Sequence, residues 1–353
     1  MSKLFKGVVL ALFIIFFETN TYAQNEYLVS KCSSNINRTK NKIIHISDIH
    51  VGYDYNDELF SKIIENIGSK YGQIANESVV LITGDLIDEA MKIKHGNVKN
   101  YYDFYFKEID NKIDILRKNG FCVLVTPGNH DLKVKDKDYM GDYYNSKENY
   151  LLLDAEKKFK EAFYKKSENS IRTFPSLDIF GSVAYIGINS MSSCTPVMEE
   201  KEFYKLGYSL YYNEEGDIYF RIGKEQLDRL ETLVTSIEMG EYMGVNKVVL
   251  YMHHVEKASH SEDYKRFFKI IGNLKKTKVV GLFAGHIHEF KTDKKHWNKA
   301  VPTFTAGSAT GTCTKEEKKC DSYSLFIEFL DSGKINKVLQ VENLQNKNII
   351  LLF

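Results

Sequence analysis

The chain has 353 residues, of which 43% are hydrophobic and 27% are charged, so it can bury a large core and does not have the composition of a disordered protein. This length fits one large α/β domain or two smaller domains. The 48 Lys and Arg residues nearly balance the 47 Asp and Glu residues, which argues against a general nucleic-acid binder or a protein that coats anionic membranes.

Residues 1–23 differ from the rest of the chain. Lys3 and Lys6 precede the apolar run VVLALFIIFF, and small side chains stand where a signal peptidase would cut near Ala23. This pattern predicts a signal peptide and an exported protein, periplasmic or secreted. The run is too short to span a bilayer comfortably, so we expect no stable membrane span after cleavage, with an uncleaved anchor as the alternative. Cleavage would leave 46 basic and 46 acidic residues.

Short apolar runs alternate with helical patterns along the mature chain. The runs are rich in Val, Ile and Phe and lie at 42–50, 79–85, 121–131, 247–254 and 279–288. Near-continuous apolar strands are typical of sheets covered on both faces. The helical patterns lie at 57–71, 98–119, 224–240 and 261–275. This alternation predicts a layered α/β fold.

Three further runs near the C-terminus, PTFTAGS, YSLFIEFL and INKVLQV, are typical of successive strands joined by short turns. We expect them to form a second, more antiparallel sheet. Polar, Tyr-rich stretches at about 132–180 and 191–222 interrupt the alternation, and the first contains one helical pattern. Loops of this length are often lids or substrate walls. Because the sequence has no repeat, Pro-rich linker or low-complexity tract, we interpret residues 24–353 as a single domain with two insertions.

Side chains that can bind metals stand at the C-terminal end of each of these five runs. They are Asp48 and His50, then Asp85, then Asn129 beside His130, then His253, and finally His286 and His288. Ligands bind at the carboxyl ends of strands in open α/β sheets, so we expect these side chains to meet. Carboxylates, an amide oxygen and imidazoles without a thiolate suit divalent Mn, Fe or Zn, and their number exceeds what one ion needs. The sequence therefore predicts two divalent metal ions.

The spacing within these clusters also favours a shared cavity. In D-x-H and H-x-H, residues i and i+2 of an extended strand point to the same side. Gly84, Gly128 and Gly285 each stand directly before the first ligand of their cluster. At these positions a side chain would obstruct a close approach or forbid a positive φ.

The ordered series DIH, GDLID, GNHD, a His in MHH, and GHIH resembles the calcineurin-like metallophosphoesterase superfamily, over residues 43 to about 310. The resemblance implies a four-layer αββα sandwich in which helices flank two facing mixed β-sheets. It also implies a dinuclear centre whose bridging hydroxide attacks a phosphoester. Asp48, His50, Asp85 and His288 would hold the first ion, and Asp85, Asn129, His253 and His286 would hold the second.

His130 and Asp131 are the predicted catalytic residues. His130 stands next to a ligand but is not assigned to an ion, so it can protonate the leaving group or stabilise the charge of the transition state. Asp131 is expected to orient that imidazole or to raise its pKa. The resemblance favours His253 over His254 as the ligand from MHH, and His254 remains the alternative.

GDLID has Asp88 where purple acid phosphatases have Tyr, which argues against their iron–tyrosinate centre. GDLID together with GNHD most resembles the class III cyclic-nucleotide phosphodiesterases. The export signal argues against a cytosolic second messenger as the substrate. We therefore expect a phosphohydrolase that favours phosphodiesters. A phosphomonoesterase or nucleotidase is one alternative, and a non-catalytic metal-binding scaffold on the same fold is another.

Five cysteines lie in the mature chain, and Cys313 with Cys320 is the expected disulfide.

Overall fold

The computed structural model describes residues 27–32, 38–52, 56–87, 98–132, 149–166, 173–190, 222–255, 262–288, 291–293, 301–310, 322–342 and 348–351. The predicted signal peptide, the expected Cys313–Cys320 pair and nearly all of the second insertion lie outside these residues. The prediction of one domain with two insertions also stays a prediction.

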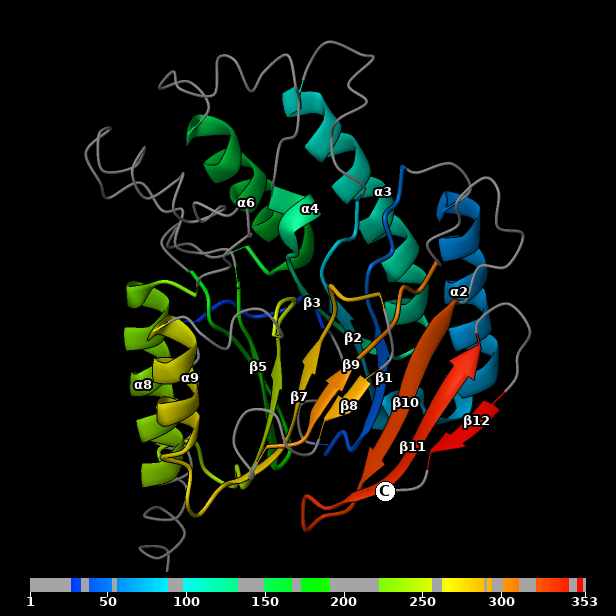
Figure 1. Cartoon of the computed structure of the whole chain (residues 1–353). Helices are drawn as coiled ribbons and strands as arrows, with labels where there is room; N and C mark the ends of the chain where they lie inside the picture. The colour runs from blue at the N-terminus through cyan, green and yellow to red at the C-terminus, as the bar shows by residue number, and fades with distance from the viewer. Residues whose placement is uncertain are drawn as a thin grey trace, which may run out of the picture.

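Two six-stranded mixed sheets form the centre of the described structure (Figure 1). The first sheet has the order β12 (Asn348–Leu351), β11 (Ile335–Glu342), β10 (Tyr323–Phe329), β1 (Lys42–Ile46), β2 (Ser78–Thr83) and β3 (Cys122–Thr126). The second has the order β4 (Ser176–Phe180), β5 (Val183–Gly187), β6 (Lys247–Tyr251), β7 (Lys278–Ala284), β9 (Thr303–Thr305) and β8 (Lys291–Asp293).

The longer helices agree with the patterns in the sequence, whereas the 3₁₀ helix and the four-residue helix were not predicted. They are α2 (Asn56–Tyr71), followed by the 3₁₀ helix η1 (Gly72–Glu77), then α3 (Val98–Lys118), the short α4 (Asn129–Leu132), α6 (Asn149–Phe163), α8 (Lys224–Met239) and α9 (Glu262–Ile271). No helix within the described residues combines the length and the apolar character needed to cross a bilayer.

The parallel strands of each sheet end at one rim. In the first sheet β1, β2 and β3 are parallel neighbours, and β10 pairs with the other side of β1 in antiparallel fashion. In the second sheet β5, β6, β7 and β9 are parallel in turn, and β4 and β8 are antiparallel edge strands. Parallel neighbours place their carboxyl ends at the same edge of a sheet. The polar clusters predicted at the strand ends therefore lie along that edge, which we call the rim.

Alternate residues of the central strands face opposite layers. In β2, Val80 and Ile82 pack in the core shared with α2 and α3, whereas Val79 and Leu81 pack in the core between the two sheets. The second sheet buries its outer face against α8 and α9. Helices, sheet, sheet and helices therefore form the predicted four-layer αββα sandwich (Figure 1).

The C-terminal strands correct one expectation. They do not form a separate antiparallel sheet, because β10 pairs with β1, with Lys42 opposite Glu328, and β11 continues the first sheet beyond β10. The strand β9 instead joins the second sheet beside β7. Apolar periodicity identified these strands, but it carries no information about which strand edge each one completes.

The hairpin β4–β5 was missed as a pair of strands. Its antiparallel register places Phe180 opposite Val183, and Gly181 turns the chain between them with φ of 57°. Two apolar runs separated by Gly181 and Ser182 are a hairpin signal, which the interpretation of residues 132–180 as an insertion overlooked. The helix expected within that insertion is confirmed as α6.

Residues 27–32 fasten the start of the described chain to the core. The carbonyl of Leu28 accepts a hydrogen bond of 2.9 Å from a backbone amide of β4. Ser30 donates from its Oγ to the buried Asp178 Oδ1 at 2.7 Å. Cys32 forms a disulfide with Cys122 in β3, across a sequence separation of 90 residues. Spacing alone did not identify this pair, because its cysteines meet only through the folded topology.

The loops beyond the strand ends pass through left-handed backbone conformations. Among the described residues, the non-glycine positions with positive φ are Asp48 (54°), His50 (51°), Asp85 (50°), His286 (78°) and His288 (52°). The expectation that D-x-H and H-x-H continue as extended strand is therefore wrong, because the first and last residue of each motif have left-handed backbone. Non-glycine residues in this region cost about 1 to 3 kcal/mol each, and such residues cluster at functional sites.

Gly84 and Gly128 confirm the expected need for small residues at this rim. A Cβ on Gly128 would lie 2.2 Å from Asp85 Oδ1 and 2.4 Å from the Asp85 backbone nitrogen. Gly84 has φ of +82°, and its Cβ would lie 2.6 Å from the Gly128 nitrogen. The loops after β2 and β3 can touch only because neither residue has a side chain.

Replacing Gly128 by Ala should destabilise the protein by about 1 to 3 kcal/mol, because the added methyl group overlaps backbone that cannot rotate away. Gly72→Ala is the matched control, since a Cβ there meets nothing within 4 Å. Urea unfolding of both variants measures the difference. Equal stabilities for the two variants would contradict the close loop contact.

Replacing Cys32 and Cys122 together by Ala should lower the free energy of unfolding by about 2 to 5 kcal/mol, because the disulfide closes a long loop. The measurement is urea unfolding of the wild type and the double variant under oxidising conditions. Reductant should lower the stability of the wild type towards that of the variant. A double variant as stable as the oxidised wild type would rule out a structural role for this bond.

Candidate metal centre

The carboxylate of Asp85 lies at the middle of the polar cluster. Its Oδ1 accepts a hydrogen bond of 2.8 Å from the backbone amide of His130. Its Oδ2 lies 3.1 Å from His253 Nε2 and 3.9 Å from His50 Nε2. Those imidazoles come from different sheets, so one carboxylate oxygen faces both of the predicted ligand sets.

The first predicted set is assembled at the rim. Asp48, His50, Asp85 and His288 offer ligand atoms that all lie within 4.8 Å of one another. His288 Nε2 is 3.4 Å from His50 Nε2 and 3.3 Å from Asp48 Oδ1. Ligand atoms bound to one ion at about 2.1 Å stand roughly 3.0 to 3.4 Å apart in octahedral or tetrahedral geometry. The two His288 distances fit this range, and the four residues form a group that could hold a metal ion.

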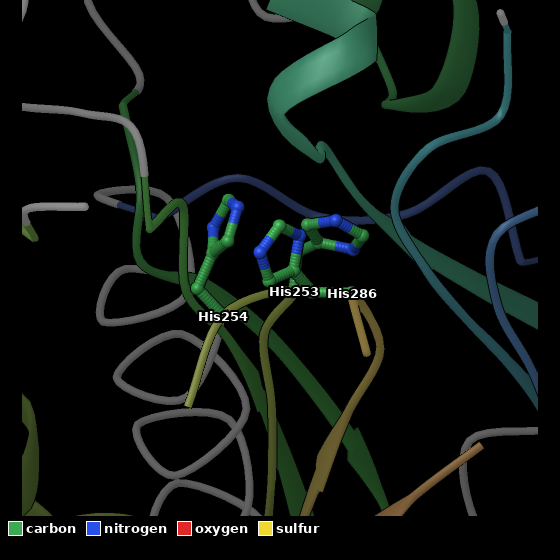
Figure 2. Close-up of side chains that lie close together, drawn as sticks. All are labelled: His253, His254 and His286. Atoms are coloured by element: carbon green, nitrogen blue, oxygen red, sulfur yellow. The ribbon is translucent and has the colours of Figure 1, made fainter. Parts of the chain in front are cut away.

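A second set lies at the ends of β6 and β7. His253, His254 and His286 have ring nitrogens within 4.8 Å of one another, and Figure 2 shows the three side chains next to each other. Asn129 reaches this set through its Oδ1, which is 2.9 Å from His254 Nε2. The predicted ligands of both ions thus meet at one rim, and His254 joins them there.

Hydrogen bonding decides which nitrogen His253 can offer. Its Nδ1 lies 2.6 Å from the carbonyl oxygen of Thr83, which can only accept, so Nδ1 carries the hydrogen. In the neutral ring, which is the form that binds a metal, Nε2 therefore keeps a lone pair. This nitrogen is buried and makes no hydrogen bond within the described residues. A buried nitrogen of this kind beside a carboxylate fits a metal ligand, because a cation would satisfy both groups.

The charge of the site also fits a cation. Asp48 and Asp85 are 0% and 1% exposed, and their ion pairs within the described residues are with histidine rings. Burial raises the pKa of Asp85, but the charges of His253 and His130 outweigh burial and hold that pKa well below its usual range. Burial lowers the pKa of His253, but Asp85 raises it overall to about 9. Buried carboxylates need such compensation, and this donor set suits divalent Mn, Fe or Zn.

His130 approaches the cluster from its more exposed side. Its Nε2 lies 3.9 Å from Asp85 Oδ2, and 22% of its side chain is exposed. Its ring packs edge to face against His50, with the ring centroids 4.6 Å apart. A phosphoester that approached from solvent could therefore contact this imidazole.

Asp131 has a different role from the one expected. Its Oδ1 accepts hydrogen bonds from the amides of Leu86 at 2.8 Å and Ile87 at 3.1 Å, and its Oδ2 accepts from Gly128 at 2.8 Å. These are its hydrogen bonds within the described residues, and none goes to an imidazole. Burial raises the pKa of this carboxyl to about 7. Asp131 therefore ties the loops after β2 and β3 together, because its oxygens face backbone amides.

The sequence analysis missed several residues that fix the ligand loops. Ser308 Oγ donates to the carbonyl of Asp48 at 2.8 Å, and Thr310 Oγ1 donates to the carbonyl of Ile49 at 2.7 Å. Ser190 Oγ lies 2.6 Å from His254 Nδ1. Ser190 and Ser308 follow β5 and β9 closely, so the signal that revealed the other site residues, a polar residue at a strand end, was present.

Several solved structures are similar to this chain at low sequence identity. The structures it resembles include a 5′-nucleotidase from Candida albicans, with 10% identity and a TM-score of 0.42. That match covers 90% of this chain but 53% of the nucleotidase, so the chain spans about half of that protein. GAP50 of Plasmodium has 9% identity, a TM-score of 0.43 and 88% coverage of both chains. A Vps29 mutant of Entamoeba histolytica has 13% identity, a TM-score of 0.34 and coverage of 88% and 99%.

No curated protein matches the sequence. The sequence model described as calcineurin-like phosphoesterase matches residues 41–290, which include every predicted ligand. By this match, the chain belongs to the calcineurin-like phosphoesterase family.

Proposed function

We propose that the protein is an exported phosphohydrolase that uses two divalent metal ions. The residues for the first ion are Asp48, His50, Asp85 and His288, and those for the second are Asp85, Asn129, His253 and His286. The observation that carries this proposal is the position of Asp85 Oδ2, 3.1 Å from His253 Nε2 and 3.9 Å from His50 Nε2. A carboxylate in that position can bridge two ions.

Two divalent ions in these positions would supply Lewis acidity towards the phosphoryl oxygens and would make a bound water a nucleophile near neutral pH. The protein fixes the positions of the ligand side chains. The Asp48 carboxylate accepts bonds from the backbone amide of His286 at 3.2 and 3.1 Å, which joins the two sheets beside the site. Preorganised ligands of this kind avoid reorganisation during the reaction.

His130 is the proposed proton donor to the leaving group. Its ring lies beside Asp85 and His50, it is partly exposed, and it belongs to neither ligand set. Phosphoester cleavage leaves an alkoxide or phenoxide oxygen that needs a proton or a nearby positive charge, and an imidazolium can supply either. We place phosphodiesters ahead of monoesters as substrates, following the GDLID and GNHD motifs.

Export is supported by two independent features. Residues 1–23 have the pattern of a signal peptide. The disulfide between Cys32 and Cys122 is typical of proteins in oxidising compartments outside the cytoplasm. The proposed location is the periplasm or the extracellular space.

Purified protein loaded with Mn²⁺ should hydrolyse bis-p-nitrophenyl phosphate, and a chelator should abolish the activity because the site loses its Lewis acid. The rate on mono-p-nitrophenyl phosphate tests the diester preference, and a faster monoester rate would assign a phosphomonoesterase or nucleotidase. If the protein contains two ions but hydrolyses no phosphoester, the proposed enzymatic activity is refuted and a non-catalytic scaffold is favoured.

Replacing His130 by Ala should lower kcat by on the order of 100- to 10,000-fold, because the leaving group loses its proton donor. The metal content should stay near two ions per chain. His50→Ala is the contrasting variant and should lose an ion together with activity. Loss of metal from the His130 variant would instead make His130 a ligand.

A further inference from the structure

The pair His253-His254 presents two adjacent imidazoles, both fully buried, at the end of β6 (Figure 2). Their hydrogen bonds differ. His253 donates from Nδ1 to the carbonyl of Thr83 and directs Nε2 towards Asp85. His254 contacts oxygen atoms at both ring nitrogens, Ser190 Oγ at 2.6 Å from Nδ1 and Asn129 Oδ1 at 2.9 Å from Nε2.

The chemistry of these partners assigns the hydrogen of His254. The amide oxygen of Asn129 can only accept, so Nε2 must carry the hydrogen. Nδ1 of the neutral ring is then an acceptor, and the hydroxyl of Ser190 can donate to it. In this tautomer His254 has no lone pair on the nitrogen that faces the cluster, unlike His253.

Further hydrogen bonds hold the backbone on either side of the contact between Ser190 and His254. The backbone amide of His254 donates to Ser190 Oγ at 3.3 Å, and its carbonyl accepts from Tyr264 of α9 at 3.0 Å. Next to Ser190, the backbone of Asn189 exchanges two hydrogen bonds with the side chain of Gln226 in α8, at 2.9 and 2.8 Å. The position of Ser190 is therefore set by a helix of the outer layer.

We propose that His254 is a positioning residue that orients the side-chain oxygen of Asn129 towards the second ion, with Ser190 fixing the tautomer that allows it. This inference rests on the proposed function for the identity of the second site. A carbonyl oxygen has two lone pairs, so Asn129 Oδ1 can accept from His254 and still face a cation. The two histidines thus have different roles. The neutral ring of His253 offers a lone pair to an ion, and His254 donates a hydrogen bond to Asn129.

Two substitutions separate this role from that of a ligand. His254→Gln places an amide N–H near the position of Nε2 and keeps the donor to Asn129. The side chain introduced by His254→Asn is shorter, so it can keep the contact with Ser190 but cannot reach Asn129. Calorimetric titration of metal-free protein with Mn²⁺, without substrate, should show the second ion bound about 10- to 100-fold more weakly in the Asn variant, with the Gln variant close to wild type.

Two results would overturn the proposal. If both variants lose the second ion to the same extent, His254 is itself a ligand, and if neither changes the affinity, the contact with Asn129 has no effect on binding. Ser190→Ala should weaken the second ion in the same direction as His254→Asn, because the preferred tautomer loses its support.

A measurement on metal-free protein tests the assignment even if the proposed function fails. The ¹⁵N shifts of the neutral His254 imidazole should show its hydrogen on Nε2. The opposite tautomer for His254 would overturn the positioning role. Wild-type protein that binds fewer than two ions, but shows the expected tautomer, would instead count against the dinuclear function.

Discussion

The structure is organised around two buried carboxylates. Asp48 and Asp85 are almost inaccessible to water, and in the described residues their ion-pair partners are imidazoles. Removing such charges from water is expensive unless a compensating charge is close. The surrounding loops therefore arrange donors around a small volume where a cation would be strongly favoured.

Neither sheet contains a complete ligand set. Asp48 and Asp85 follow strands of the first sheet, whereas His253 and His286 follow strands of the second. The hydrogen bonds from His286 to Asp48 and from His253 to Thr83 cross from one sheet to the other. The site is therefore also a joint between the sheets, and its geometry depends on how the core between them is packed.

Much of this arrangement could be predicted from the sequence, because the central strands are continuous apolar runs that end in polar clusters. Parallel strands bring such clusters together whatever the details of the loops. The bond partners of Asp131, the left-handed turn at Asp48 and the disulfide of Cys32 could not be predicted in the same way. Each depends on atoms supplied by residues far away in the chain, and local periodicity contains no information about them.

The place of β10 in the first sheet has a consequence for the order of folding. The strand β1 lies between β2, which follows it closely, and β10, which begins at Tyr323. During synthesis the first sheet must stay unfinished until the residues of β10, Tyr323–Phe329, have left the ribosome. Pairings of such long range form slowly. A chain that cannot complete its first sheet early stays unfolded for longer, which is compatible with the export proposed above.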